Sequence, residues 1–260
     1  MIPSVSGVMM KFRATTVAIF AALVLFPPSA IAASTSPPPS VASQEVSEAD
    51  RKAFRGAIAS NPVLTLIQES FPEEYGPFET QLLRDASTGA LNTQQVMERT
   101  STFITAIQLR LLPDLPKASA AELKALMVQH VAATQVLQKY NLHACREFGA
   151  GRGSTMEMYA SLPEEAVRAL QAYSATEMRT AISGAKQKLR HAPLKDGALE
   201  PVVLRYEKAG GSLEFLAVMA DPSSGVLTPA EHCRDTILWL QLISEESPEL
   251  IASVLSAEED

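Results

Sequence analysis

The stretch "TPAEHCRDTILWLQLI", Thr228 to Ile243, decides the fold class of this 260-residue chain. It opens with a hydroxyl residue three positions before Glu231, the pattern of a capping box, in which each side chain bonds the other residue's backbone N–H. From Asp235 onward it is apolar nearly all round and contains Trp239, the single tryptophan of the chain. A helix of that composition is enclosed by other helices. The stretch therefore predicts a central helix of a bundle.

The same start signal recurs twice, as "SAAE" (Ser119 to Glu122) and "SLPE" (Ser161 to Glu164). Asn61, Asn92 and Ser247 are further N-cap residues that precede apolar-periodic segments. The helices expected from these signals span residues 48–61, 93–112, 120–148, 162–191, 201–209, 213–220, 228–243 and 248–256, and a further helix starts at Asn61-Pro62. We expect an all-α protein with a single compact bundle of about nine or ten helices and no strand.

The N-terminus has the features of a secretory signal peptide. Lys11 and Arg13 precede the apolar run Thr15 to Phe26, and Ala30-Ile31-Ala32 matches the small-x-small pattern of a cleavage site. A run of about a dozen residues is too short to span a bilayer as a helix. We expect cleavage after Ala32, with Met1, Met9 or Met10 as the start of translation.

This assignment divides the chain into three segments. Residues 1–32 are the signal peptide, and residues 33–46 form a flexible tether rich in proline and serine. Residues 47–260 are the helical domain. The expected location is the periplasm or the exterior, with no stable membrane insertion after cleavage.

The charge of the chain excludes some partners. The formal net charge is −7, and removal of Lys11 and Arg13 with the signal peptide makes it −9. Nucleic-acid binders need a basic footprint, and an anionic membrane surface also attracts basic segments. The overall charge argues against both and favours a basic protein partner.

Cys145 and Cys233 are the only cysteines. In an oxidising compartment an isolated pair of cysteines is expected to form a disulfide. A loop of this length, 88 positions, gives about 4.5 kcal/mol of stabilisation in the chain-entropy model. The predicted role of the pair is structural.

The glycine-rich stretch "FGAGRGST", Phe148 to Thr155, invites comparison with phosphate-binding loops. A P-loop needs lysine before the Ser or Thr, and the dinucleotide fingerprint would need glycine at Ser154. Neither condition is met. We expect Gly149 to end one helix in the left-handed conformation and Ser154 to start the next. The alternative is an anion held by Arg152 and the glycine amides.

The histidines His130, His143, His191 and His232 lack the spacing of zinc ligands, so no metal and no cofactor is expected. His130 follows the apolar pattern of its segment and is expected in or beside the core. A thiol nucleophile paired with a neighbouring histidine is disfavoured because the thiols are expected to be oxidised.

The segment "IQESFP", Ile67 to Pro72, resembles over six residues the catalytic motif of lytic transglycosylases, a family of exported and largely helical enzymes. The resemblance implies that Glu69 is a general acid, which requires an apolar pocket to raise its pKa. The Gly-Leu-Met-Gln element of that family has no counterpart downstream. A solvated glutamate at a helix end is the other interpretation.

Three functions follow from these observations. The first, which we favour, is an exported acidic protein-binding module of the inhibitor or immunity type that neutralises a basic exported partner by occlusion, without catalytic residues. The second is a peptidoglycan-acting glycosidase that uses Glu69. The third is a carrier of a small apolar ligand inside the helical bundle.

Overall fold

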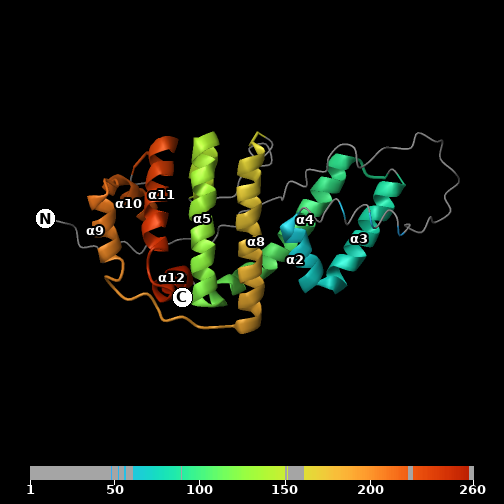
Figure 1. The fold of residues 1–260 in the computed structure, drawn as a ribbon, viewed down its shortest axis with the longest axis horizontal. Helices are drawn as coiled ribbons and strands as arrows, with labels where there is room; N and C mark the ends of the chain where they lie inside the picture. The colour runs from blue at the N-terminus through green and yellow to red at the C-terminus, as the bar shows by residue number, and fades with distance from the viewer. Residues whose placement is uncertain are drawn as a thin grey trace. The chain divides into compact units, whose positions relative to one another are not determined.

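The computed structural model describes residues 61–88, 90–149, 151, 161–221 and 225–257, together with Glu48, Lys52 and Gly56. Within these residues every regular element is helical, with ten α-helices and one 3-10 helix (Figure 1). The all-α fold and the single disulfide are thereby confirmed. The predicted signal peptide, the tether and most of the first predicted helix lie outside the described residues.

The described helices belong to two compact units, where we expected one bundle. Residues 61–108 lie in the smaller unit and residues 109–257 in the larger. Each unit has its own buried apolar residues, which are Ile67, Leu82 and Ile104 in the smaller one and Leu123, Phe215 and Leu240 in the larger one.

The smaller unit contains α2 (Pro62–Ser70), α3 (Pro72–Ser87) and most of α4 (Thr93–Leu111). Asn61 caps α2 as predicted, because its side chain accepts from the amides of Val63 and Leu64. The rings of Phe78 and Phe103 stack with centroids 3.9 Å apart and join α3 to α4.

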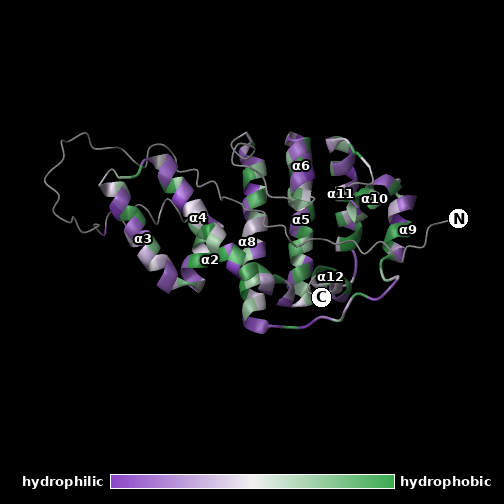
Figure 2. Ribbon diagram, turned by 180° about the vertical axis from the view of Figure 1, so that it is seen from behind, coloured by the Kyte–Doolittle hydropathy of each residue, from purple (hydrophilic) through white to green (hydrophobic). Residues whose placement is uncertain are grey.

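The larger unit is built around the central helix α5 (Ala120–Tyr140), which packs against α8, α11, α12 and α6. Figure 1 shows α5 between α8 and α11, and Figure 2 shows hydrophobic residues alternating with hydrophilic ones along these helices. The other elements are η2 (Leu112–Lys117), α6 (Leu142–Gly149), α8 (Glu164–Gln187), α9 (Glu200–Lys208), α10 (Leu213–Ala220), α11 (Pro229–Ser244) and α12 (Pro248–Ser256).

Helix α11 is enclosed, as its sequence predicted. Trp239 and Leu240 are 2% and 1% exposed and pack in one cluster with Tyr206 of α9, Phe215 of α10 and Ile251 of α12. The cluster stabilises the fold mainly by burying aromatic and aliphatic surface.

Two of the three predicted capping boxes are present. Ser119 and Glu122 bond reciprocally at the start of α5, and Thr228 and Glu231 do so at the start of α11. The third prediction is wrong, because Pro163 is the N-cap of α8. A proline disfavours the helical conformation of the residue before it, so a helix cannot readily include Leu162. In α11 the residue before Pro229 is the N-cap Thr228, which is extended, so the proline does not disturb the start of that helix.

Two predicted helix ends are also wrong. The helix expected over residues 120–148 ends at Tyr140, since Asn141 is extended and its side chain accepts from the Ala144 amide at 3.0 Å to start α6. Cys145 therefore lies on α6 and not on the long helix. Helix α8 ends at Gln187, where Lys188 adopts a left-handed conformation with φ 53°.

Candidate functional site

The disulfide joins Cys145 of α6 to Cys233 of α11, with Cα atoms 5.5 Å apart. Both residues are fully buried, and no free cysteine is present in the described part of the chain. A bonded, buried sulfur cannot act as a nucleophile, so the pair is structural.

The glycine-rich segment begins with a close approach between two helices. Gly149 is the buried last residue of α6, and a Cβ on it would lie 2.5 Å from Thr236 Cγ2 on α11. The left-handed residue is Gly151, with φ 73°, whose amide donates to the Phe148 carbonyl at 3.0 Å. The prediction that Gly149 itself is left-handed is therefore wrong. Arg152 and Ser154 lie outside the described residues, and the anion-site alternative lies there with them.

An interior cluster of polar and aromatic side chains lies between α5, α6 and α8. The half-buried ring of His130 packs against the rings of Phe148 and Tyr173, and its Nε2–H donates to the Phe148 carbonyl at 3.2 Å. Burial lowers the pKa of His130 to about 4. This position agrees with the expectation of a histidine in or beside the core.

Glu177 belongs to the same cluster. The Tyr173 hydroxyl donates to Glu177 Oε1 at 3.1 Å, one helical turn away on α8. Burial of the Glu177 carboxyl raises its pKa to about 7, because desolvation disfavours the charged form. Two titratable groups shifted in opposite directions make this cluster sensitive to pH, and sequence patterns did not reveal Glu177.

The residue proposed as a general acid has a different environment. Glu69 is exposed near the C-terminal end of α2. A carboxyl group with that role needs an apolar enclosure to hold its proton at neutral pH. The position of Glu69 fits the interpretation of a solvated glutamate at a helix end.

The remaining histidines are dispersed. His143 is exposed, His191 Nε2–H donates to the Ala118 carbonyl at 2.7 Å, and buried His232 packs edge-on against Phe215. Within the described residues, no three His, Cys, Asp or Glu side chains are grouped as metal ligands would be.

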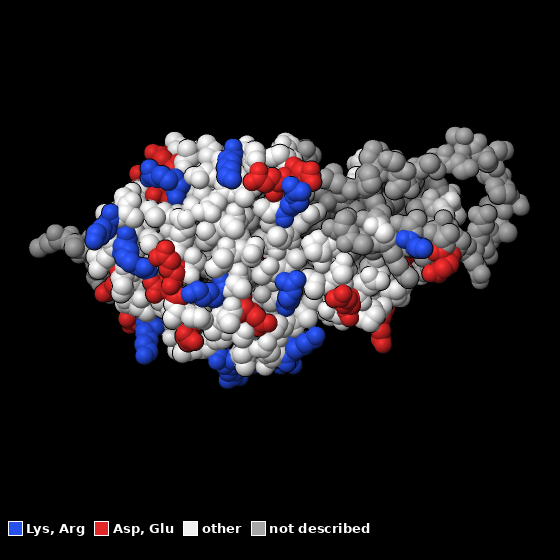
Figure 3. Space-filling model, viewed as in Figure 1, with Lys and Arg blue, Asp and Glu red and all other residues white. Residues whose placement is uncertain are grey.

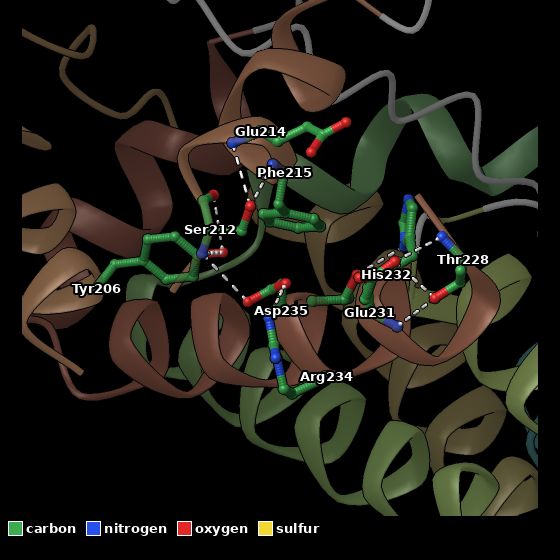
Figure 4. A network of polar contacts seen from close by, with 10 residues as sticks. Tyr206, Ser212, Glu214, Phe215, Thr228, Glu231, His232, Arg234 and Asp235 are labelled. Carbon is green, nitrogen blue, oxygen red and sulfur yellow. Dashed lines mark hydrogen bonds and ion pairs between the residues drawn. The ribbon is translucent and has the colours of Figure 1, made fainter. Parts of the chain in front are cut away.

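A polar network fixes the turn between α9 and α10 onto α11 (Figure 4). Asp235 is fully buried, and its carboxylate accepts from the Ser212 amide at 3.4 Å and from Arg234 at 2.8 Å. The Tyr206 hydroxyl also accepts from the Ser212 amide, at 3.0 Å. Burial and the Asp235 charge raise the pKa of Tyr206. Gly211 is required here because a Cβ would lie 2.3 Å from the Tyr206 ring.

The network orients α10. The Ser212 side chain caps this helix by accepting from the amides of Glu214 and Phe215. Of its eight residues, only Phe215 and Leu216 are buried, although the sequence LEFLAVMA has a single polar residue. Val218 and Met219 are half-buried, with Met219 packed against the core, and the other four residues of this apolar helix, Leu213, Glu214, Ala217 and Ala220, are exposed.

The outward side of α10 is an apolar strip between acidic residues. Leu213, which is 63% exposed, and Ala217 lie one turn apart on one side of the helix. Glu214 and Asp221 are exposed beside them. Val226, 93% exposed, follows Gly225, and a Cβ on Gly225 would lie 2.9 Å from Glu214 Oε1. We call these five residues, Leu213, Glu214, Ala217, Asp221 and Val226, the α10 face.

Comparison of the chain with protein-family models, with characterised proteins and with solved structures gives no match. In the described part of the chain, no helix has the length and apolarity needed to cross a membrane.

Proposed function

We propose that this protein is an exported acidic binding module that neutralises a basic exported protein by covering part of its surface, as inhibitors and immunity-type proteins do. The observation that carries the proposal is the α10 face. Leu213 and Val226 are 63% and 93% exposed, far more than the side chains that fill the core. Exposed apolar residues gathered beside acidic ones are typical of interaction surfaces.

The α10 face is held by a rigid framework, which favours binding. The Ser212 cap and its bonds to Tyr206 and Asp235 fix the start of α10. The capping box of Thr228 fixes the chain two residues after Val226. A surface that is ordered before it meets a partner loses less conformational entropy on association.

The disulfide and the N-terminal sequence support export. Cys145 and Cys233 form a buried disulfide, a bond that persists in oxidising compartments. The sequence of residues 1–32 has the charged start, apolar run and small residues of a signal peptide. Both features fit a protein of the periplasm or the exterior.

The charge of the chain selects the kind of partner. The net charge is −7, and Glu214 and Asp221 place negative charge beside the apolar strip. A basic surface with an apolar anchor site is complementary to this arrangement. Binding by occlusion requires no catalytic group on this chain.

Site-specific photo-crosslinking in the producing cells tests the proposal. A photoreactive phenylalanine analogue at Leu213 should form a crosslink to one defined, basic, exported protein. The matched control is the same analogue at Leu204, which is 65% exposed on the side of α9 opposite buried Val202 and Tyr206. Equal crosslinking from both positions, or none from Leu213, would refute the proposal.

A further inference from the structure

The last turn of α8 and the segment that follows it carry a local excess of positive charge. Four exposed cations, Lys186, Lys188, Arg190 and Lys195, lie within ten residues, and no acidic residue occurs from Met178 to Lys195. We call these four cations the basic edge. The net charge of −7 conceals this separation of charge along the chain.

The cations of the basic edge lack acidic partners. Elsewhere in the larger unit, six cations pair with acidic side chains, in Lys117–Asp114, Lys139–Glu165, Arg146–Glu147, Arg168–Glu164, Arg205–Glu246 and Arg234–Asp235. The scattered cations Lys124, Arg179 and Lys208 pair with no described acidic side chain. None of the four cations of the basic edge makes an ion pair with a described residue. Their charge is therefore available to an external anion.

The backbone beneath these cations is fixed. The left-handed conformation of Lys188 ends α8 and turns the chain. The Leu189 amide then donates to the Lys117 carbonyl at 3.0 Å, and the His191 ring donates to the Ala118 carbonyl. In Figure 1 the segment runs along the lower edge of the larger unit, and Figure 3 shows Lys and Arg side chains projecting along that edge.

An exposed leucine lies among the cations. Leu189 is 42% exposed between Lys188 and Arg190. Lys and Arg beside an exposed apolar side chain match the two layers of an anionic bilayer surface, because phosphates attract the cations and the interface accepts the leucine. A nucleic acid or an acidic polypeptide would attract the cations but would not offer Leu189 the apolar interface of a bilayer.

We propose that the basic edge docks this protein reversibly on an anionic phospholipid surface. Each cation near such a surface contributes roughly a five-fold gain in binding, so four of them give a gain on the order of several hundred-fold. The α10 face is a separate surface, and this proposal does not depend on its function.

Co-sedimentation with vesicles tests the docking. The mature protein should bind vesicles of phosphatidylglycerol and phosphatidylcholine in equal parts, bind pure phosphatidylcholine vesicles far less, and dissociate as salt increases. The double variant Lys186→Gln, Arg190→Gln should lose about 25-fold in partitioning to the anionic vesicles. Leu189→Ser should lose a few-fold and keep the salt dependence.

The matched control is Lys139→Gln, Arg168→Gln, which removes one lysine and one arginine that are already paired with acids. It should stay within about two-fold of the wild type. The proposal is overturned if the two double variants bind alike, if both vesicle types bind the wild type equally, or if soluble polyglutamate competes away vesicle binding at low concentration. All substituted side chains are exposed, and circular dichroism checks that each variant is folded.

Discussion

Gly149 of α6 and Thr236 of α11 are in contact at a point where a Cβ on the glycine would lie 2.5 Å from Thr236 Cγ2. Cys145 precedes Gly149 by four positions on α6, and Cys233 precedes Thr236 by three positions on α11. Residues three or four positions apart lie on the same side of a helix, so the disulfide and the contact join the same sides of α6 and α11. A covalent bond and a close contact thus join α6 to α11 along one line.

Gly149→Ala should destabilise the protein by about 1–3 kcal/mol, because the new methyl group overlaps a packed side chain. Thr236→Ser removes only the Cγ2 atom and keeps the hydroxyl that lies 3.1 Å from His232 Nδ1. The double variant should therefore recover much of the loss. Urea denaturation of the four members of this cycle measures the coupling.

Gly76→Ala is the matched control. Gly76 lies inside α3, and a Cβ there meets no atom within 4 Å. Alanine is favoured over glycine inside a helix by about 0.5–1 kcal/mol, but Pro77 disfavours the helical conformation of a preceding residue that has a Cβ. The two effects oppose each other, so this variant should stay within about 1 kcal/mol of the wild type. If Gly149→Ala behaves in the same way, the close contact between α6 and α11 is not as described.

Replacement of both cysteines by serine should lower the free energy of unfolding by about 4 kcal/mol, because the disulfide closes a loop of 88 positions. Guanidinium denaturation measures the loss, and the wild type in strong reductant should reproduce it. A helical circular dichroism spectrum should remain wherever the variant is folded. A loss below 1 kcal/mol would show that noncovalent packing alone holds α6 on α11.

The success of the sequence-based predictions depends on how local each signal is. The capping boxes at Ser119 and Thr228 were predictable because each box involves only four consecutive residues. The same pattern at Ser161 failed because Pro163 restricts the residue before it. The break at Asn141 was missed, since the apolar pattern continues across it into α6.

The sites were less predictable than the helices. The helix at residues 213–220 was expected, but its outward apolar side depends on the network of Tyr206, Ser212 and Asp235, which lie far apart in the sequence. The elevated pKa of Glu177 likewise depends on burial by other helices. The basic edge was hidden because a net charge averages over segments of opposite sign.

Glu177→Gln should make stability less dependent on pH. In the folded state Glu177 has a pKa of about 7 and keeps its proton up to that pH, while the unfolded state loses it near the ordinary pKa of 4.5. Its contribution to stability is therefore full below pH 4.5 and is lost as the pH rises through 7. The variant should be more stable than the wild type by about 1–3 kcal/mol at pH 8 and equal to it at pH 4.

His130 changes the stability of the protein with pH in the opposite direction. Its pKa falls from 6.5 to about 4 on folding, so the unfolded state takes up the proton first, and stability decreases as the pH falls from 6.5 to 4. In the wild type, the protonation of Glu177 partly offsets this loss of stability at acid pH. Glu177→Gln lacks that offset, so its stability should decrease as the pH falls. Thermal melts from pH 4 to 8 measure both trends, with exposed Glu164→Gln as the control. A constant difference between Glu177→Gln and wild type across this range would contradict the burial of Glu177.

Glu69→Gln tests the glycosidase alternative. Glu69 is exposed, so the variant should melt at the wild-type temperature. We expect neither protein to release soluble fragments from purified peptidoglycan. Release by the wild type that the substitution abolishes would establish Glu69 as a catalytic acid and would displace the binding proposal.

Surface plasmon resonance on the partner captured through Leu213 tests whether the α10 face binds a basic exported protein. Leu213→Ser should raise the dissociation rate about ten-fold or more, as expected for an apolar anchor at the centre of an interface. Leu204→Ser, on an equally exposed leucine, should leave that rate unchanged. Glu214→Gln should slow association at low salt and have little effect at high salt. Equal dissociation rates for Leu213→Ser, Leu204→Ser and the wild type would show that the α10 face does not bind this partner.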